Sequence, residues 1–247
     1  MASKKRNTQR RKNGRPGTPP TTQRPAPSNP AAATLILSAY DITDEPLEDR
    51  ILRRLPPQVR ARIPDLFTKV HRAPKEVIPE LEHLLATYPD VPPFSNYLCA
   101  AYQQAGDTAK AEALIRENYA RHPEYLFAKV NYAQICLHKG DTRQIPVIFD
   151  HKYDLQQLYP HRKRFHISEF TGFAAVMCGY FCAIGEQEIA ALYYRVLEQV
   201  APNHPITRQA KRTLYPPFWI RLLRKWVARH ASPTDKAQNQ TETRGME

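Results

Sequence analysis

The sequence predicts an all-α protein built from repeated pairs of helices, and three observations support this. The tripeptide Gly-Asp-Thr at 106–108 recurs at 140–142, 34 residues further along the chain. Apolar residues around these tripeptides return every three or four positions, which is the period of an amphipathic helix. Only residues 34–37 have the β-branched, apolar character of a strand. A fixed period of about 20–50 residues is typical of solenoids, in which each unit buries an apolar face against the next.

Glycine, acid and proline positions divide each repeat into two helices. Gly106 is expected to end a first helix, because glycine enters the left-handed conformation of a C-cap without steric cost. The acid after it is expected to cap the second helix, which Pro123 ends. A third copy begins at Gly185, 45 residues after Gly140 rather than 34. The eleven additional residues are expected within 150–168, either lengthening a helix or forming a loop on one face.

The same periodicity places eleven helices along the chain. Prolines at 64, 79 and 146 are expected to kink or shorten three of them. The expected helices lie near residues 46–55, 57–71, 74–87, 93–105, 108–121, 125–138, 142–158, 168–183, 187–200, 205–214 and 217–230.

The repeated positions resemble the tetratricopeptide repeat: a bulky apolar residue, a small residue, an aromatic, Gly, Ala, an apolar residue and Pro. The copy at 92–125 supplies Leu98, Cys99, Tyr102, Gly106, Ala111, Ile115 and Pro123. The copy at 171–204 supplies Met177, Cys178, Phe181, Gly185, Ala190, Tyr194 and Pro202. The copy at 126–170 has Ile145 in place of Ala and contains the insertion, and the copy at 58–91 lacks the turn glycine.

This resemblance implies a right-handed solenoid of about three to four helix-turn-helix repeats between residues 43 and 230. Such a stack exposes the apolar face of its last repeat, so capping helices are expected at 205–230. Residues 217–230 combine apolar residues, Trp219 and Trp226 among them, with four cations at helical spacing. A helix of this kind either closes the end of a solenoid or lies on an anionic membrane, and both roles stay open.

Basic segments at both ends flank a nearly neutral body within a net charge of +12. Residues 1–30 hold eight Lys or Arg, six Pro and no acid, so 1–33 is expected to be a disordered tail, as is 231–247. Residues 203–230 hold seven Lys or Arg and no acid. Cations in residues 4–24 predict nonspecific nucleic-acid binding through phosphate neutralisation; a solubilising or targeting role stays open equally.

Several classes of protein lack support in the sequence. Four cysteines without a CxxC pair predict neither a disulfide framework nor a zinc site. Phosphate-loop, GxGxxG, HExxH and GxSxG motifs are missing, so we expect no cofactor, no metal and no enzymatic activity. No apolar run approaches the roughly 18 residues of a membrane span, which favours a cytoplasmic, reduced compartment.

The resemblance also implies a concave groove lined by the first helices of successive repeats. Its lining is expected to be rich in amides and poor in charge, and suited to an extended peptide. The family's Lys and Asn clamp for terminal carboxylates is missing, because Asn96 and Ala100 stand in its place. The expected groove residues are Asn96, Gln103, Gln104, Phe127, Val130, Gln134 and His138, with Ala100, Leu137, Ala175, Gly179 and Cys182 beside them.

A second cluster lies in the insertion, where Arg162, Lys163 and Arg164 stand between His161 and His166. Three interpretations stay open here: a solvated basic loop, an anion site, and a metal or catalytic site that uses the histidines. Taken together, the sequence predicts a non-catalytic adaptor that binds a partner protein or peptide. The alternative is a nucleic-acid-associated factor that uses the basic tail and the basic C-terminal helix.

Overall fold

The computed structural model describes residues 40–47 and 50–219. These residues form eleven helices and two short strands, which confirms the predominantly helical fold. The expected tails at 1–33 and 231–247, the expected strand at 34–37 and most of the expected helix at 217–230 lie outside the described residues. The basic segment at 4–24 lies outside them as well.

The helices in chain order are α1 (Arg50–Arg53), α2 (Pro57–Arg72), α3 (Pro74–Thr87), α4 (Pro92–Ala105), α5 (Thr108–Arg121), α6 (Leu126–His138), α7 (Gln144–Ile148), α8 (Leu155–Leu158), α9 (Ile167–Ala183), α10 (Gln187–Val200) and α11 (Pro205–Leu214). The strands are β1 (Asp41–Thr43) and β2 (Arg164–His166).

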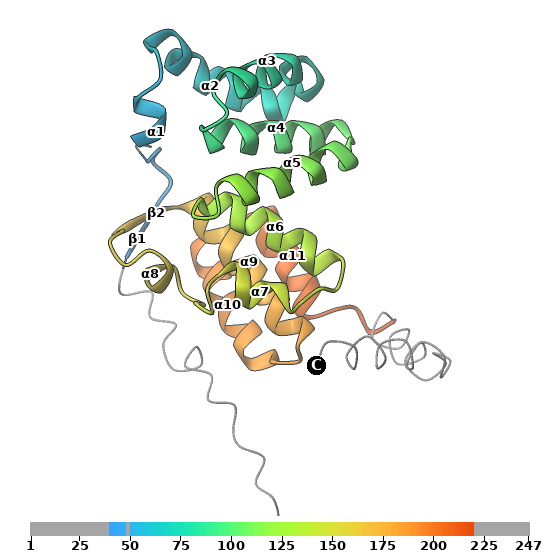
Figure 1. The fold of residues 1–247 in the computed structure, drawn as a ribbon. Coiled ribbons are helices and arrows are strands. Elements are labelled where there is room, and N and C mark those ends of the chain that lie inside the picture. Colours follow the sequence, from blue (N-terminus) through green and yellow to red (C-terminus); the bar gives the residue numbers. More distant parts are fainter. Residues whose placement is uncertain (1–39, 48–49, 220–247) are drawn as a thin grey trace, which may run out of the picture.

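From α2 to α7 and from α9 to α11 each helix packs against the next one along the chain, and a second set of contacts skips over the intervening helices (Figure 1). The second set of contacts joins α2 to α4, α4 to α6, α6 to α9 and α9 to α11. Apolar residues of α2–α5 form one core, and those from α6 to α11 form a larger one. Between the two lies a small cluster of Cys99, Ile115 and Ile135. The chain is therefore one continuous stack of helices.

Left-handed glycines follow three of the helices, as predicted. Gly106, Gly140 and Gly185 have φ of 86°, 76° and 89° after α4, α6 and α9. The predicted acidic cap forms once, where the Asp107 carboxylate accepts a hydrogen bond of 3.2 Å from the Lys110 N–H. Glu186 precedes α10 without such a side-chain bond, and Asp141 lies two residues before the cap position of α7. The glycine, rather than the acid, is the feature shared by the repeats.

The prediction of one helix over 142–158 is wrong. The segment forms α7 and α8, separated by a turn in which Asp150 and His151 both have positive φ. Pro146 lies within the five-residue α7, whereas α2 and α3 reach their expected lengths through Pro64 and Pro79. The buried Lys129 ammonium donates to the Ile148 carbonyl at 2.7 Å and so holds the end of α7.

The insertion does not lengthen a helix; much of it is irregular and exposed, but buried residues anchor it in the core. Leu155 and Phe165 are both fully buried in the larger core. β2 pairs in parallel with β1, so that Asp41 lies opposite Arg164, and the Asp41 N–H donates to the Lys163 carbonyl at 2.8 Å. The Tyr40 ring meets the Phe165 ring edge-on at 5.0 Å. Residues 40–43 are thus held by the insertion. The sequence predicted neither of the two strands, β1 and β2, that make this contact.

Changing Gly106 tests whether its left-handed conformation stabilises the repeat. A Cβ at this position would meet nothing within 4 Å, so any cost comes from the backbone and not from a clash. Gly106→Ala is expected to lower the free energy of unfolding by about 1–2 kcal/mol, measured by urea denaturation with far-UV circular dichroism. Gly106→Asn should lose less, because Asn tolerates this conformation. Equal losses for Ala and Asn would contradict this explanation.

Candidate binding groove

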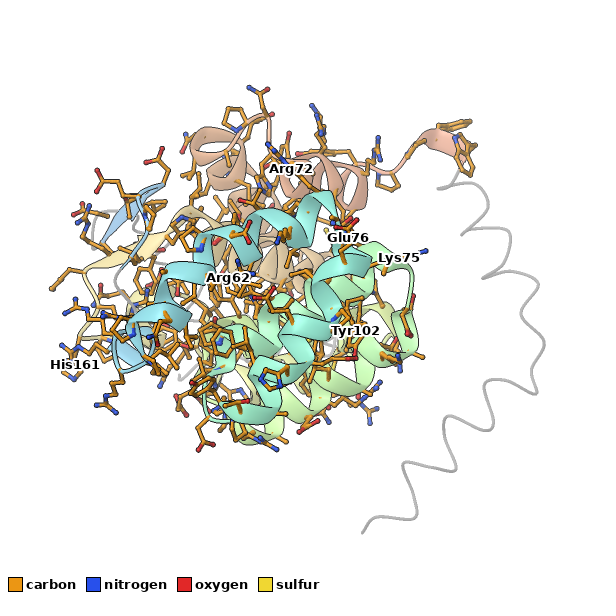
Figure 2. The ribbon with its side chains drawn as sticks, turned by 90° about the horizontal axis from the view of Figure 1, so that it is seen from above. Arg62, Arg72, Lys75, Glu76, Tyr102 and His161 are labelled. Carbon is orange, nitrogen blue, oxygen red and sulfur yellow. The ribbon has the colours of Figure 1, made fainter. Side chains whose placement is uncertain are left out.

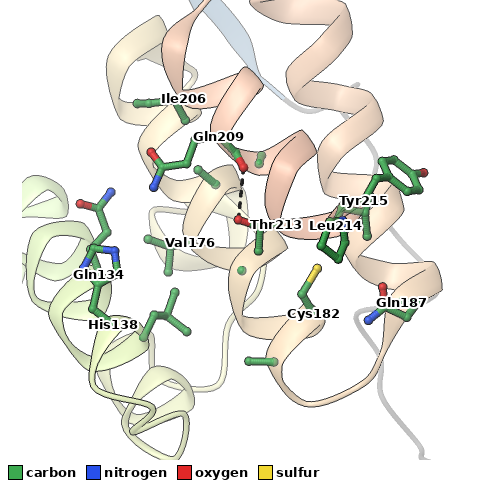
Figure 3. Close-up of a pocket in the computed structure, with 16 residues that line it drawn as sticks. Gln134, His138, Val176, Cys182, Gln187, Ile206, Gln209, Thr213, Leu214 and Tyr215 are labelled. Atoms are coloured by element: carbon green, nitrogen blue, oxygen red, sulfur yellow. Dashed lines mark hydrogen bonds between the residues drawn. The ribbon is translucent and has the colours of Figure 1, made fainter. Parts of the chain in front are cut away.

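A groove of about 850 Å³ lies along the C-terminal half of the stack (Figure 3). Helix α9 runs between α6 on one side and α11 on the other, because it packs against both. All three helices contribute side chains to the lining, and Tyr215 and Pro216 complete one end. The groove is therefore made mainly by α6, α9 and α11, with Gln187 added from α10.

Small residues of α9 leave the space between its two neighbours. Ala175, Gly179 and Ala183 are four residues apart and all line the groove. Gly179 also allows α6 to approach, since a Cβ there would lie 3.2 Å from Leu137 Cδ1. The small residues of α9 therefore allow α6 to pack closely and also leave space in the middle of the groove.

Neutral polar groups stand on both sides of this floor. Gln134 and His138 come from α6, and Gln209 and Thr213 come from α11. The Thr213 hydroxyl donates to the Gln209 backbone carbonyl at 3.1 Å. This bond does not involve the side-chain amide of Gln209. Among the described residues, neither the Gln134 nor the Gln209 side chain has a hydrogen-bond partner. None of the lining residues in the part of the chain that the structure describes is Asp, Glu, Lys or Arg. The groove thus offers amides and apolar surface without charge.

The structure brings some of the predicted groove residues together and separates others. Gln134 and His138 line the groove, together with Leu137, Ala175, Gly179 and Cys182. Gln103 and Gln104 are exposed on α4 but lie outside it. The prediction had included residues of α4, whereas the lining comes from α6, α9, α10, α11 and the residues that follow α11.

Three other predicted residues are occupied by contacts within the chain. The Asn96 side-chain oxygen accepts a hydrogen bond of 2.9 Å from the Asn131 side-chain amide, which links α4 to α6. Phe127 is half-buried with its ring 5.7 Å from that of Tyr125. Val130 is only 3% exposed, because Gly172 lets α9 close over it. Val130 therefore packs in the core and does not face a groove.

The wall formed by α11 was not predicted as part of a groove. Its buried face consists of Thr207, Ala210 and Leu214, which hold the helix against α9 and α10. Gln209 and Thr213 are four residues apart on the remaining surface. That spacing was visible in the sequence, but only the position of α11 beside α9 shows that these two residues face α6.

Two of the cysteines pack in the interior of the protein. Cys99 and Cys178 are buried, as their place at the small-residue position predicted. Burial raises the pKa of Cys99 to about 12. A hydrogen bond with Cys182, and then burial, raise the pKa of Cys178 far above its ordinary value. Thiols held protonated in this way are poor nucleophiles.

The three cations of the insertion have three different surroundings. Arg162 forms a two-pronged ion pair with the partly buried Glu169, at 3.0 and 2.7 Å, and its guanidinium lies 4.2 Å from the Phe165 ring centre. Glu169 also accepts from the His166 N–H at 3.0 Å. Lys163 is exposed, and Arg164 lies 3.6 Å from Glu45. Arg162 therefore stabilises the start of α9, and its guanidinium is already paired with Glu169 instead of being open to an external anion.

The described residues contain no group of three or more His, Cys, Asp or Glu placed to hold a metal ion. Nor does any helix within the described ranges have the length and apolar character needed to cross a membrane. Comparison with family models, with curated proteins and with solved structures gave no match to this chain. The geometry and chemistry of the groove are thus the basis for a functional proposal.

The Arg162–Glu169 pair is expected to stabilise the fold. Glu169→Gln keeps the size of the side chain but removes the charge that Arg162 faces, and should lower the free energy of unfolding by about 2 kcal/mol in urea denaturation. Glu45→Gln is the matched control, because it removes the acid of an exposed pair in the same region and should cost less than about 0.5 kcal/mol. Similar losses for both variants would assign the pair no special role.

Proposed function

We propose that this protein is a non-catalytic adaptor that holds an uncharged segment of a partner protein in the groove between α6, α9 and α11. One observation carries the proposal: among the described residues that line the groove none is Asp, Glu, Lys or Arg, yet the side-chain amides of Gln134 and Gln209, on opposite sides, have no partner within that part of the chain. Its volume of about 850 Å³ falls in the range of about 300–1,000 Å³ that is typical of ligand clefts.

We also propose that the helix pairs form a short array of the tetratricopeptide type. The left-handed glycines at 106, 140 and 185 support this, because each follows a helix that contacts its counterpart in the next pair. On this proposal α4, α6 and α9 are the first helices of three repeats, and α11 occupies the place of a further first helix. The groove then lies on the face that such arrays use for binding.

An extended peptide matches the lining better than a helix does. Backbone N–H and C=O groups of an extended chain need new partners when they leave water, whereas those of a helix are already paired. Gln134 and Gln209 each offer a donor and an acceptor from opposite sides. Leu137, Ile206 and Leu214 supply apolar contact for the peptide's side chains. The glutamines thus serve the backbone, and the apolar residues serve the side chains.

The absence of charge in the lining sets the selectivity. A charged peptide side chain in the groove would lose water and find no opposite charge, which is costly. Peptides rich in Ala, Val, Leu, Ser or Thr avoid that cost. This groove therefore selects against acidic and basic segments alike.

The wall amides provide a direct test. A random linear peptide display library, selected on the full chain, is expected to yield peptides poor in Asp, Glu, Lys and Arg. A double change of Gln134 and Gln209 to Ala should weaken their affinity by about tenfold in calorimetric titration, since each amide bond is worth roughly 0.5–1.5 kcal/mol. The double change of Gln103 and Gln104 to Ala removes two amides outside the groove and should leave the affinity unchanged.

A second pair of variants separates loss of binding from loss of fold. Ala183→Arg places a bulky charge in the groove from an exposed position and should abolish binding. Ala109→Arg makes the same change at an exposed position of α5 and should not. If the selected peptides bind the Ala183→Arg variant as tightly as the unaltered chain, the groove is not their site and the proposal fails.

A further inference from the structure

A cationic surface lies on the part of α11 that the groove does not use. Arg208, Lys211 and Arg212 are all exposed, because Thr207, Ala210 and Leu214 turn the opposite side of the helix into the body. None of the three cations forms an ion pair with a described residue. Their charge is therefore available to an external partner.

Exposed aromatic residues follow these cations directly. Tyr215, Phe218 and Trp219 are 59%, 73% and 64% exposed. They are three of the seven large hydrophobic residues that are exposed in the described part of the chain, and all fall within five residues. Residues 215–219 run away from the helical body in Figure 1. Such a concentration of exposed rings at one end of a fold marks an interaction surface.

We propose that α11 and residues 215–219 bind the surface of an anionic phospholipid membrane. Aromatic rings favour the boundary between headgroups and acyl chains, and cations nearby are attracted to anionic lipids. The sequence continues this character, because residues 220–230 add four Lys or Arg, further apolar residues and no acid. The two proposed surfaces meet at Tyr215 and Pro216, which also line one end of the groove, but this proposal does not depend on a peptide bound there.

The arrangement of the rings favours a membrane over single-stranded nucleic acid. A nucleic-acid groove sets aromatic rings among its cations, so that bases stack while phosphates are neutralised alongside. Here Phe218 and Trp219 do not line a groove, although cations precede and follow them in the sequence, and they lie on a segment that leaves the body. Rings in that position insert at the boundary between headgroups and acyl chains, while the cations of α11 face the anionic headgroups.

Tryptophan fluorescence tests this surface alone. The chain has two tryptophans, Trp219 and Trp226, so Trp226→Phe makes Trp219 the single reporter in the full chain. Vesicles of phosphatidylcholine with phosphatidylserine are expected to shift its emission to the blue, and acyl chains carrying bromine should quench it. Vesicles of phosphatidylcholine alone should have little effect, and added salt should weaken the response.

Charge variants show where the attraction arises. Changing Arg208, Lys211 and Arg212 to Gln should reduce partitioning to the anionic vesicles by up to about 100-fold. The matched control changes Arg60, Arg72 and Lys75 to Gln, which removes three exposed cations from α2 and α3. Arg72 and Lys75 are labelled in Figure 2. The control should partition nearly as well as the parent, because its cations lie on other helices and its basic N-terminal segment is unchanged.

Three outcomes would overturn the proposal. Sedimentation with anionic vesicles without a change in Trp219 emission would place the contact elsewhere in the chain. Equal weakening by the two sets of charge variants would indicate general electrostatic attraction. Quenching of Trp219 by oligothymidylate, with no blue shift on vesicles, would assign the surface to nucleic acid.

Discussion

The close packing of α6 against α9 is the constraint on which the rest of the structure depends. Gly172 and Gly179 are seven residues apart, and a Cβ on either would lie 3.2 Å from a side chain of α6. Because both positions are glycine, Val130 and Leu137 pack directly against the backbone of α9. Helix α9 also carries α10 and α11, so its approach to α6 determines how wide a space remains between α6 and α11. The width of the groove therefore depends on glycine at positions 172 and 179.

The regular helices could be predicted from the sequence because their signals are local. Helices α3, α5, α10 and α11 begin and end at the predicted residues, since caps and periodicity lie within the segments themselves. The insertion could not be predicted in this way. β1 and β2 are distant in sequence and only three residues each, and the end of α7 is held by Lys129 from another helix. Nothing within 142–166 records those partners.

The groove was predictable in part for the same reason. Gln134 and His138 are four residues apart on α6, so their shared face could be predicted from the helical period, and both line the groove. Val130 lies one turn earlier on α6 and was predicted to be accessible, yet it is covered. Its burial depends on Gly172, a residue in a different repeat. Periodicity identifies the face of a helix, whereas the partner helix decides which turns of that face remain open.

Helix α11 joins the two proposed surfaces without merging them. Its Thr207, Ala210 and Leu214 are buried, so its remaining residues divide between the groove and the solvent. Gln209 and Thr213 face the groove, and Arg208, Lys211 and Arg212 carry the charge. A neutral groove would hold its peptide with little sensitivity to salt, whereas a cationic surface would release anionic lipid as salt rises. The same helix therefore contributes to two contacts of opposite character, and ionic strength should separate them in one sample.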